Sequence, residues 1–114
     1  MNNCIFCDII EKIIPSKILY EDDLCLVFED IAPQAPTHIL SIPKNHIEKI
    51  SDMKQTDKSL IGHLVYSLKK IASQKNLSED GYRIVINCGE LGGQMVDHLH
   101  VHLLAGRQMN WPPG

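Results

Sequence analysis

The chain has no long hydrophobic run, no cluster of basic residues, no internal repeat and no low-complexity segment. No apolar stretch approaches the roughly 20 residues of a membrane-spanning helix, so we expect no membrane partner. The 11 basic and 14 acidic residues are interspersed. This argues against a nucleic-acid-binding surface, because phosphate contacts along a duplex need clustered Lys and Arg. A small nucleotide needs few donors and is compatible with this composition. The length predicts one domain over 1–114.

The segment before Cys4 has neither the basic region nor the hydrophobic stretch of an export signal. We therefore expect a cytoplasmic protein. In that compartment the four cysteines are better explained as reduced thiols or metal ligands than as disulfides.

Hydrophobic periodicity and turn residues predict an α+β domain with an antiparallel sheet and helices packed against it. The first expected elements are a short helix over 5–14, which Pro15 ends, and strands at 19–20, 25–28 and 38–43. A long helix follows, capped by Asp57 and with an apolar stripe from Leu60 to Ile71. The last two elements are a strand over 82–88 and a fifth strand that holds the histidines.

Three histidines alternate with aliphatic residues near the C-terminus, as His98-Leu99-His100-Val101-His102. Alternation at period two predicts a strand that carries all three imidazoles on one face and the aliphatic residues on the other. Three interpretations follow from the row itself. The histidines could hold Zn²⁺ as in hydrolytic enzymes, serve as hydrogen-bonding spacers, or orient a central nucleophile, for which neutral imidazole is well suited.

A second cluster begins at the CxxC pair Cys4 and Cys7. Two thiolates at that spacing and two imidazoles complete a tetrahedral zinc shell, and His46 and His98 are the candidate partners. Such a metal would be structural, because four protein ligands leave no position for substrate. The alternative is a pair of reduced, partly buried cysteines without metal. Cys25 and Cys88 are expected to be core thiols within strands.

The histidine row and several other segments together resemble one known family. The segments are Asp30-Ile31, Pro33-Gln34-Ala35-Pro36-Thr37-His38, Ile42-Pro43-Lys44, His46, Gly92-Gly93-Gln94, Gly106-Arg107-Gln108-Met109 and Trp111-Pro112-Pro113-Gly114. They resemble the histidine-triad (HIT) superfamily of nucleotide hydrolases and transferases, and the tail resembles its Hint branch, the histidine triad nucleotide-binding proteins. The likeness runs from about Phe6 to Gly114.

The resemblance implies the HIT fold: a five-stranded antiparallel sheet with one long and one short helix, paired into a ten-stranded sheet in a homodimer. It also implies a purine nucleoside phosphoramidase that hydrolyses AMP amides without a catalytic cofactor. His100 matches the nucleophile that attacks the α-phosphorus. His102 and His38 match positions that contact phosphate oxygens or steer protons, and His98 matches a buried orienting residue.

The family pocket also maps onto named residues of this chain. Asp30 matches the carboxylate that accepts hydrogen bonds from the ribose hydroxyls. The other matched positions are Phe6, Ile9, Ile14 and Ile31 in the apolar purine slot, Asn87, Gly93 and Gln94 at the phosphate, and Trp111 in a tail that closes over the partner's pocket.

This chain departs from the family pattern at Met95, Asp97 and Asn110. Met95 stands where many relatives carry a hydroxyl that donates to the phosphate, and a thioether cannot donate. That departure keeps a nucleotide-binding regulatory module with weak catalysis as an alternative. Two further alternatives are a dinucleoside polyphosphate hydrolase of the same superfamily and a histidine-ligated metalloenzyme.

Overall fold

The computed structural model of the chain describes residues 4–114. The segment Met1–Asn3, on which the expected lack of an export signal partly rests, lies outside the described residues. The elements in order are α1 (Ile5–Ile10), β1 (Ile18–Glu21), β2 (Cys25–Glu29), β3 (Thr37–Pro43), two 3₁₀ turns (Ile50–Asp52 and Gln55–Asp57), α2 (Lys58–Gln74), β4 (Arg83–Ile86) and β5 (Val101–Ala105).

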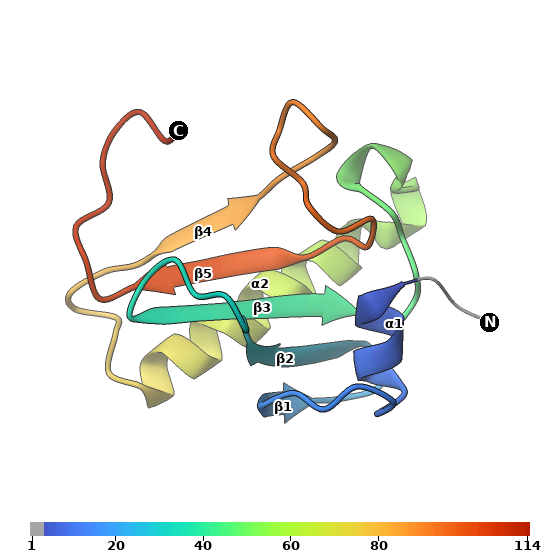
Figure 1. Cartoon of the computed structure of the whole chain (residues 1–114), viewed down its shortest axis with the longest axis horizontal. Coiled ribbons are helices and arrows are strands. Elements are labelled where there is room, and N and C mark those ends of the chain that lie inside the picture. The colour runs from blue at the N-terminus through green and yellow to red at the C-terminus, as the bar shows by residue number, and fades with distance from the viewer. Residues whose placement is uncertain (1–3) are drawn as a thin grey trace.

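All strand pairs are antiparallel, and the order across the sheet is β1-β2-β3-β5-β4. The expected α+β fold, with five antiparallel strands, one long helix and one short helix, is therefore confirmed. Strands β2 and β3 follow each other in the chain and lie side by side in the sheet. After β3, α2 carries the chain to β4 at the far edge (Figure 1). None of the described helices is long and apolar enough to cross a membrane.

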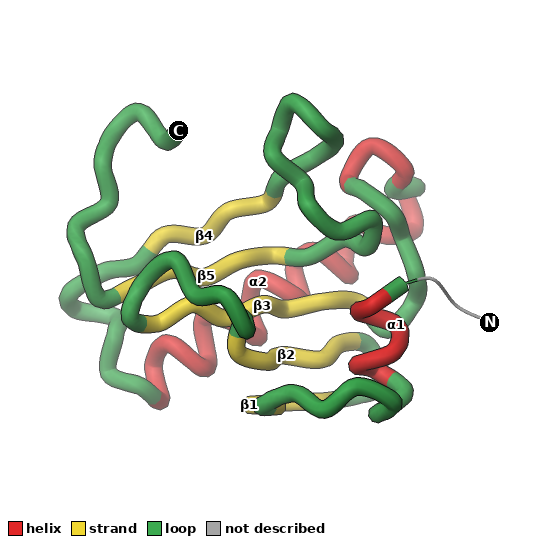
Figure 2. Tube along the Cα trace, in the orientation of Figure 1, coloured by secondary structure: helices red, strands yellow, loops and turns green. Residues whose placement is uncertain are grey.

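The two faces of the sheet bury different apolar clusters. On one face α2 contributes Leu64, Leu68 and Ile71, which pack against side chains of β2, β3 and β5. On the other face α1 covers one end of the sheet, and its Phe6 and Ile9 pack against β2 and β3. Figures 1 and 2 show α2 behind the sheet and α1 in front of it. The face that carries α1 is only partly covered by helix, which leaves room for a site.

The short helix is shorter than its apolar pattern predicts. It ends at Ile10 instead of continuing to residue 14, because Lys12 adopts a positive φ of 63°. The backbone N–H of Ile13 then donates back to the carbonyl of Asp8. Asp57 precedes α2 as expected, but its side chain does not cap that helix. It accepts instead from the backbone N–H of Lys54, at 2.9 Å, within the preceding 3₁₀ turn.

The histidine strand is also shorter than predicted, since β5 begins at Val101 and only His102 lies within it. The β3–β5 ladder stops at the pair Ser41–Val101. Just beyond it stands Pro43, which has no N–H to offer a ladder, and Leu99 instead donates to the carbonyl of Ile47 at 2.6 Å. The predicted alternation of faces still holds, because Leu99 and Val101 both point to the side of the sheet that packs against α2.

Strand β4 ends at Ile86 instead of continuing to residue 88. Cys88 therefore lies in the following loop, where it is partly exposed and its Sγ lies 3.2 Å from Ser51 Oγ. The expectation that Cys88 is a core thiol within a strand is wrong. Cys25, by contrast, is fully buried in β2, as expected.

Candidate functional site

A cavity of about 750 Å³ opens on the face of the sheet that carries α1. Its walls come from α1 and the segment after it, from β2, β3 and the loop between them, from the β4–β5 loop, and from the histidines. The predicted site residues that line it are Phe6, Ile9, Ile14, Asp30, Ile31, His38, Asn87, Gly93, Met95, His100 and His102. Eleven of the predicted residues thus meet around one space, although they come from distant parts of the sequence.

His100 is held in one ring orientation by a backbone contact. Its Nδ1–H donates to the carbonyl oxygen of His98 at 2.7 Å. Because that nitrogen carries the proton, the neutral ring keeps its lone pair on Nε2. The residue is buried, at 5% exposure, and burial lowers the pKa of His100. The neutral, nucleophilic form is therefore favoured at neutral pH.

His38 and His102 form a hydrogen-bonded pair beside it. His38 Nδ1 accepts from the backbone N–H of Gln34 at 3.0 Å, so its proton lies on Nε2. That Nε2–H donates to His102 Nδ1 at 2.9 Å, and Asp30 Oδ2 lies 3.4 Å from the same nitrogen. His102 must then carry its own proton on Nε2, which is buried and has no partner among the described residues. The Nε2–H of His102 is therefore a hydrogen-bond donor available to a ligand.

Electrostatics keep this pair neutral. Burial lowers the pKa of His102 to about 4, and the neighbouring His100 and His38 add to the effect. Burial also lowers the pKa of His38, although the Asp30 carboxylate opposes that shift. A buried N–H without an acceptor costs free energy. The arrangement is suited to an anionic ligand that would accept a hydrogen bond from the Nε2–H of His102.

The apolar part of the cavity is uneven. Phe6 and Ile9 are almost fully buried, and the Phe6 ring meets His100 edge-on with centroids 5.1 Å apart. Ile31, predicted for the same apolar slot, lines the cavity but is 99% exposed. Asp30 accepts a hydrogen bond from the backbone N–H of Ala32 at 2.8 Å. At Ile31 the loop after β2 thus leaves the cavity exposed to solvent, whereas the part lined by Phe6 and Ile9 of α1 is buried.

Three predicted residues do not line the cavity. The Gln94 side chain bridges its own loop, donating to the carbonyls of Glu48 and Val96 and accepting from the N–H of Gly89. Trp111 is 84% exposed, so any role across a dimer stays a prediction. His98 points away from the cavity and into the cysteine cluster described below.

Sequence reasoning missed several residues of the wall. Phe28 and Leu40 lie opposite each other on β2 and β3, and Leu40 also pairs with His102 on β5. The signal was present, because Leu40 follows His38 at period two and must share its face. Pro15, Ser16 and Lys17 also line the cavity. Their loop carries no pattern that predicts this.

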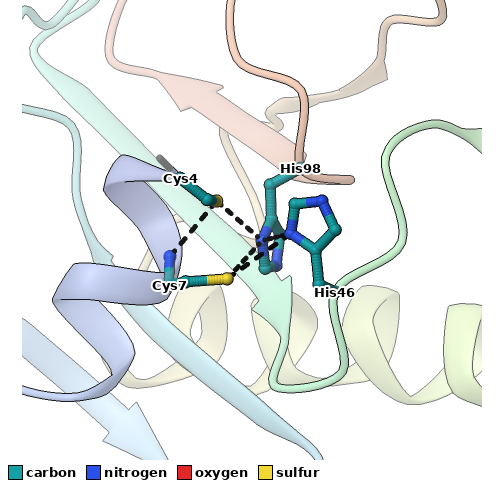
Figure 3. Close-up of side chains that lie close together, drawn as sticks. All are labelled: Cys4, Cys7, His46 and His98. Atoms are coloured by element: carbon teal, nitrogen blue, oxygen red, sulfur yellow. Dashed lines mark hydrogen bonds between the residues drawn. The ribbon is translucent and has the colours of Figure 1, made fainter. Parts of the chain in front are cut away.

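The side chains of Cys4, Cys7, His46 and His98 converge beside the cavity, and Figure 3 shows all four pointing toward a common centre. Cys4 Sγ lies 3.2 Å from His98 Nδ1, and Cys7 Sγ lies 3.4 Å from His46 Nδ1 and 3.6 Å from His98 Nδ1. The two Nδ1 atoms are 3.1 Å apart. Cys4 is the N-cap of α1 and Cys7 lies in its first turn.

These distances suit a tetrahedral metal shell. With bonds of about 2.3 Å to sulfur and 2.0–2.1 Å to nitrogen, the edges of such a tetrahedron are about 3.6 Å for S–N and 3.3 Å for N–N. His98 Nε2–H donates to the carbonyl of Pro43 at 2.9 Å, which leaves the Nδ1 lone pair facing the cluster. Burial lowers the pKa of His98 to about 4, which favours this neutral ligand form.

The three histidines of the row do not form a joint ligand set. His98 belongs with the cysteines, whereas His102 groups with His38 and Asp30. In the second group both His38 nitrogens already take part in hydrogen bonds. A catalytic zinc held by His98, His100 and His102 is therefore not supported by the arrangement of the described residues.

With this geometry in view, the model of the HIT domain family matches residues 11–109. The chain belongs to the HIT family. It is 54% identical to the 14 kDa zinc-binding protein of Zea mays over 112 residues, which cover 96% of this chain and 87% of that protein. The resemblance on which the site residues were assigned is thereby confirmed.

Two solved structures show how close the HIT fold of this chain is to its relatives. A HIT family hydrolase from Legionella pneumophila superposes with a TM-score of 0.95 and 51% identity, covering 98% of this chain and all 100% of that one. A histidine triad nucleotide-binding protein from Candida albicans gives a TM-score of 0.83 and 33% identity, covering 98% of this chain and 85% of that one.

Proposed function

We propose that this HIT-family protein is a hydrolase that cleaves the P–N bond of purine nucleoside phosphoramidates such as AMP amides. The observation that carries the proposal is the ring of His100. It lines the cavity, and its Nδ1–H is held by the His98 carbonyl, so the lone pair lies on Nε2. The similarity to the HIT family hydrolase from Legionella pneumophila supports hydrolysis as the reaction class.

In the proposed reaction His100 Nε2 attacks the α-phosphorus, the P–N bond breaks, and the amine leaves with a proton taken from solvent, which is returned when water hydrolyses the intermediate. Water then cleaves the nucleotidyl-histidine bond and releases the nucleoside monophosphate, with the His100 ring restored. This route replaces one difficult displacement at a charged phosphorus by two easier ones. The unpartnered Nε2–H of His102 donates to a phosphoryl oxygen, where it stabilises the negative charge that accumulates in the transition state.

The rest of the cavity accounts for the nucleoside. We assign the ribose hydroxyls to Asp30, because a carboxylate is an acceptor and a diol offers two donors. The purine takes the space beside Phe6, Ile9 and Ile14, with Ile31 on the open side. Asn87 and Gly93, which line the same cavity as His100 and His102, are proposed phosphate contacts together with the backbone at Gln94.

We further propose that Cys4, Cys7, His46 and His98 hold one structural Zn²⁺. Zinc bound by four protein side chains ties distant segments together and leaves no open position for substrate. The name of the maize relative, a zinc-binding protein, supports the choice of metal. Catalysis by His100 needs no cofactor in this scheme.

We also propose a homodimer in which β4 pairs with its counterpart in a second copy, giving a ten-stranded sheet. Strand β4 forms one edge of the sheet, and all four of its residues are half-buried in the single chain. An edge strand of this kind is a natural template for pairing with another chain. Sedimentation velocity would give twice the chain mass, and a monomer at micromolar concentration would contradict the proposal.

The deciding experiment follows AMP release from adenosine 5′-phosphoramidate. We expect release by the wild type and none by His100→Ala. His63→Gln is the matched control, because His63 lies on α2, outside both histidine groups, and contacts Asp22. Release by His100→Ala at the wild-type rate would refute the nucleophile. Parallel assays with diadenosine polyphosphate separate the proposed substrate from that of the polyphosphate hydrolases.

One observation favours a second candidate, a nucleotide-binding module with weak catalysis. Met95 lines the cavity, is 90% exposed and cannot donate a hydrogen bond to phosphate. If this lost donor limits turnover, Met95→Ser will raise AMP release while AMP affinity changes little. Binding of AMP by the wild type without any turnover would move the binding module to first place.

A further inference from the structure

We propose that the Cys4–Cys7–His46–His98 cluster controls the catalytic state of His100 through the backbone carbonyl of His98, so that metal occupancy sets the turnover rate. His98 is thus a positioning residue: its ring joins the cluster, and its backbone carbonyl holds the ring of His100. This inference rests on the proposed function for the role of His100, but the coupling itself concerns the geometry of two neighbouring histidines.

The first step is the way in which His98 is anchored. Its ring is held at both nitrogens, by the carbonyl of Pro43 at Nε2 and by the cluster at Nδ1. The side chain is fully buried. The backbone carbonyl of the same residue accepts the Nδ1–H of His100 at 2.7 Å. A displacement of His98 in which the backbone follows the anchored ring therefore moves the acceptor that selects the His100 tautomer.

The second step is the lack of another anchor in this stretch. The β3–β5 ladder ends at Ser41–Val101 and the β4–β5 ladder at Ile86–Val101, so within the described sheet neither His98 nor His100 has a cross-strand backbone partner. Between them only Leu99 is tied down, by its N–H to the carbonyl of Ile47. A regular strand would hold this segment through its ladder. Here the side-chain contacts of His98 carry that function.

The third step links the cluster to the wall of the cavity. Cys4 and Cys7 flank Phe6 on α1. The Phe6 ring meets His98 edge-on at 5.9 Å between centroids and His100 at 5.1 Å. A metal that joins both cysteines to His98 therefore clamps Phe6 against the two rings. Without it, ring packing and weak sulfur contacts join α1 to the His98 segment among the described residues.

The prediction is that zinc-free protein remains folded but loses the fixed tautomer of His100. We would compare zinc-loaded wild type, wild type after chelation, and Cys7→Ala, with Cys88→Ala as the matched cysteine control outside the cluster. Bound zinc is measured by elemental mass spectrometry and the fold by circular dichroism. The ¹⁵N signals of the His100 ring report which nitrogen carries the proton.

In zinc-loaded protein we expect one protonated Nδ1 and one unprotonated Nε2 signal, and in zinc-free protein signals that approach each other as tautomers interconvert. For the phosphoramidate, kcat should fall about 10- to 100-fold, the usual effect of losing an outer-shell partner, and KM should change less. Cys7→His, which keeps a ligand atom for zinc, should restore both the ring signals and kcat. Cys88→Ala should match the wild type.

Several outcomes would overturn the coupling. A folded, zinc-free protein with unchanged ring signals and unchanged kcat would do so, and so would a wild type that binds no zinc. If chelated wild type and Cys7→Ala both unfold, zinc holds the whole fold and the specific link to His100 is refuted. If zinc-loaded wild type releases no AMP while the ring signals still respond to zinc, the coupling stands and the proposed reaction fails.

Discussion

The carboxylate of Asp22 offers the sharpest test of how this fold is held together. It sits in the turn between β1 and β2 and accepts four hydrogen bonds. Oδ1 accepts from the backbone N–H groups of Leu24 and Cys25 at 2.8 and 2.9 Å. Oδ2 accepts from Tyr20 Oη–H and His63 Nε2–H, each at 2.7 Å. One side chain thus joins the turn to α2, which carries His63.

The substitution Asp22→Asn keeps the shape and removes half of the acceptors. A carboxylate has about four lone-pair sites, all used here, whereas an amide has two lone pairs and two N–H donors. Two of the four donors would then face an N–H₂ group. Hydrogen bonds to a charged group contribute about 1.5–3 kcal/mol each, and the site is a quarter exposed, which weakens them. We expect a loss of about 2–4 kcal/mol in the free energy of unfolding.

The assay is urea denaturation followed by far-ultraviolet circular dichroism at pH 7. Asp23→Asn is the matched control, since it makes the same change of charge at the adjacent, exposed position. If Asp22→Asn is no more destabilising than Asp23→Asn, the reasoning is refuted.

The pH dependence gives a second check on the same residue. Burial opposes ionisation, but the hydrogen bonds from Tyr20, Leu24, Cys25 and His63 outweigh it and hold the pKa of Asp22 well below its usual range. A carboxylate whose folded pKa is lowered stabilises the fold above its unfolded pKa, about 3.9, and this contribution is lost as the pH falls below that value. The gap between wild type and Asp22→Asn should therefore shrink below about pH 4. A constant gap would contradict the assignment.

Three further predictions concern a core residue, a glycine and the proposed ribose acceptor. Leu68→Ala, at a fully buried core position under the sheet, should cost about 2–5 kcal/mol in urea denaturation, whereas Leu91→Ala at a fully exposed position should cost less than about 0.5 kcal/mol. Gly106→Ala should lower the Tm, because Gly106 has a φ of +96° and an added Cβ would lie 2.8 Å from Pro36 Cβ; an unchanged Tm would contradict this. Asp30→Ala should remove the calorimetric preference for AMP over 2′,3′-dideoxy-AMP, and a preference that survives would exclude Asp30 as the ribose acceptor.

Much of the fold could be predicted from local pattern. The stripe from Leu60 to Ile71 predicted a long amphipathic helix, and α2 buries Leu64, Leu68 and Ile71 against the sheet. Alternation in the histidine row predicted two opposite faces, and burial of Leu99 and Val101 under α2 agrees. The grouping of Cys4, Cys7, His46 and His98 was also predicted, from the CxxC spacing and two candidate histidines, and the four side chains converge in the structure.

The rest depended on contacts between distant segments. The end of α1 is set by the positive φ of Lys12, which the apolar pattern does not encode. Asp57 was assigned as a cap from its residue type, but its carboxylate is taken by Lys54 N–H in a neighbouring turn. Gln94 resembles a phosphate contact in sequence, yet its side chain closes its own loop. For Asp57 and Gln94 the side-chain partners in the structure come from contacts that the residue type alone does not predict.

The mistaken length of the histidine strand bears directly on the chemistry. In a regular antiparallel ladder the carbonyls of a strand are used by the neighbouring strand. Had the β4–β5 ladder continued past the pair Ile86–Val101, the carbonyl of His98 would have met a backbone donor as well as the His100 ring. Both ladders of β5 stop at Val101, and beyond that point the carbonyls of Pro43 and His98 accept hydrogen bonds from imidazole N–H groups. Because neither ladder of β5 extends to His98, its carbonyl is left to the His100 ring, whose orientation it fixes.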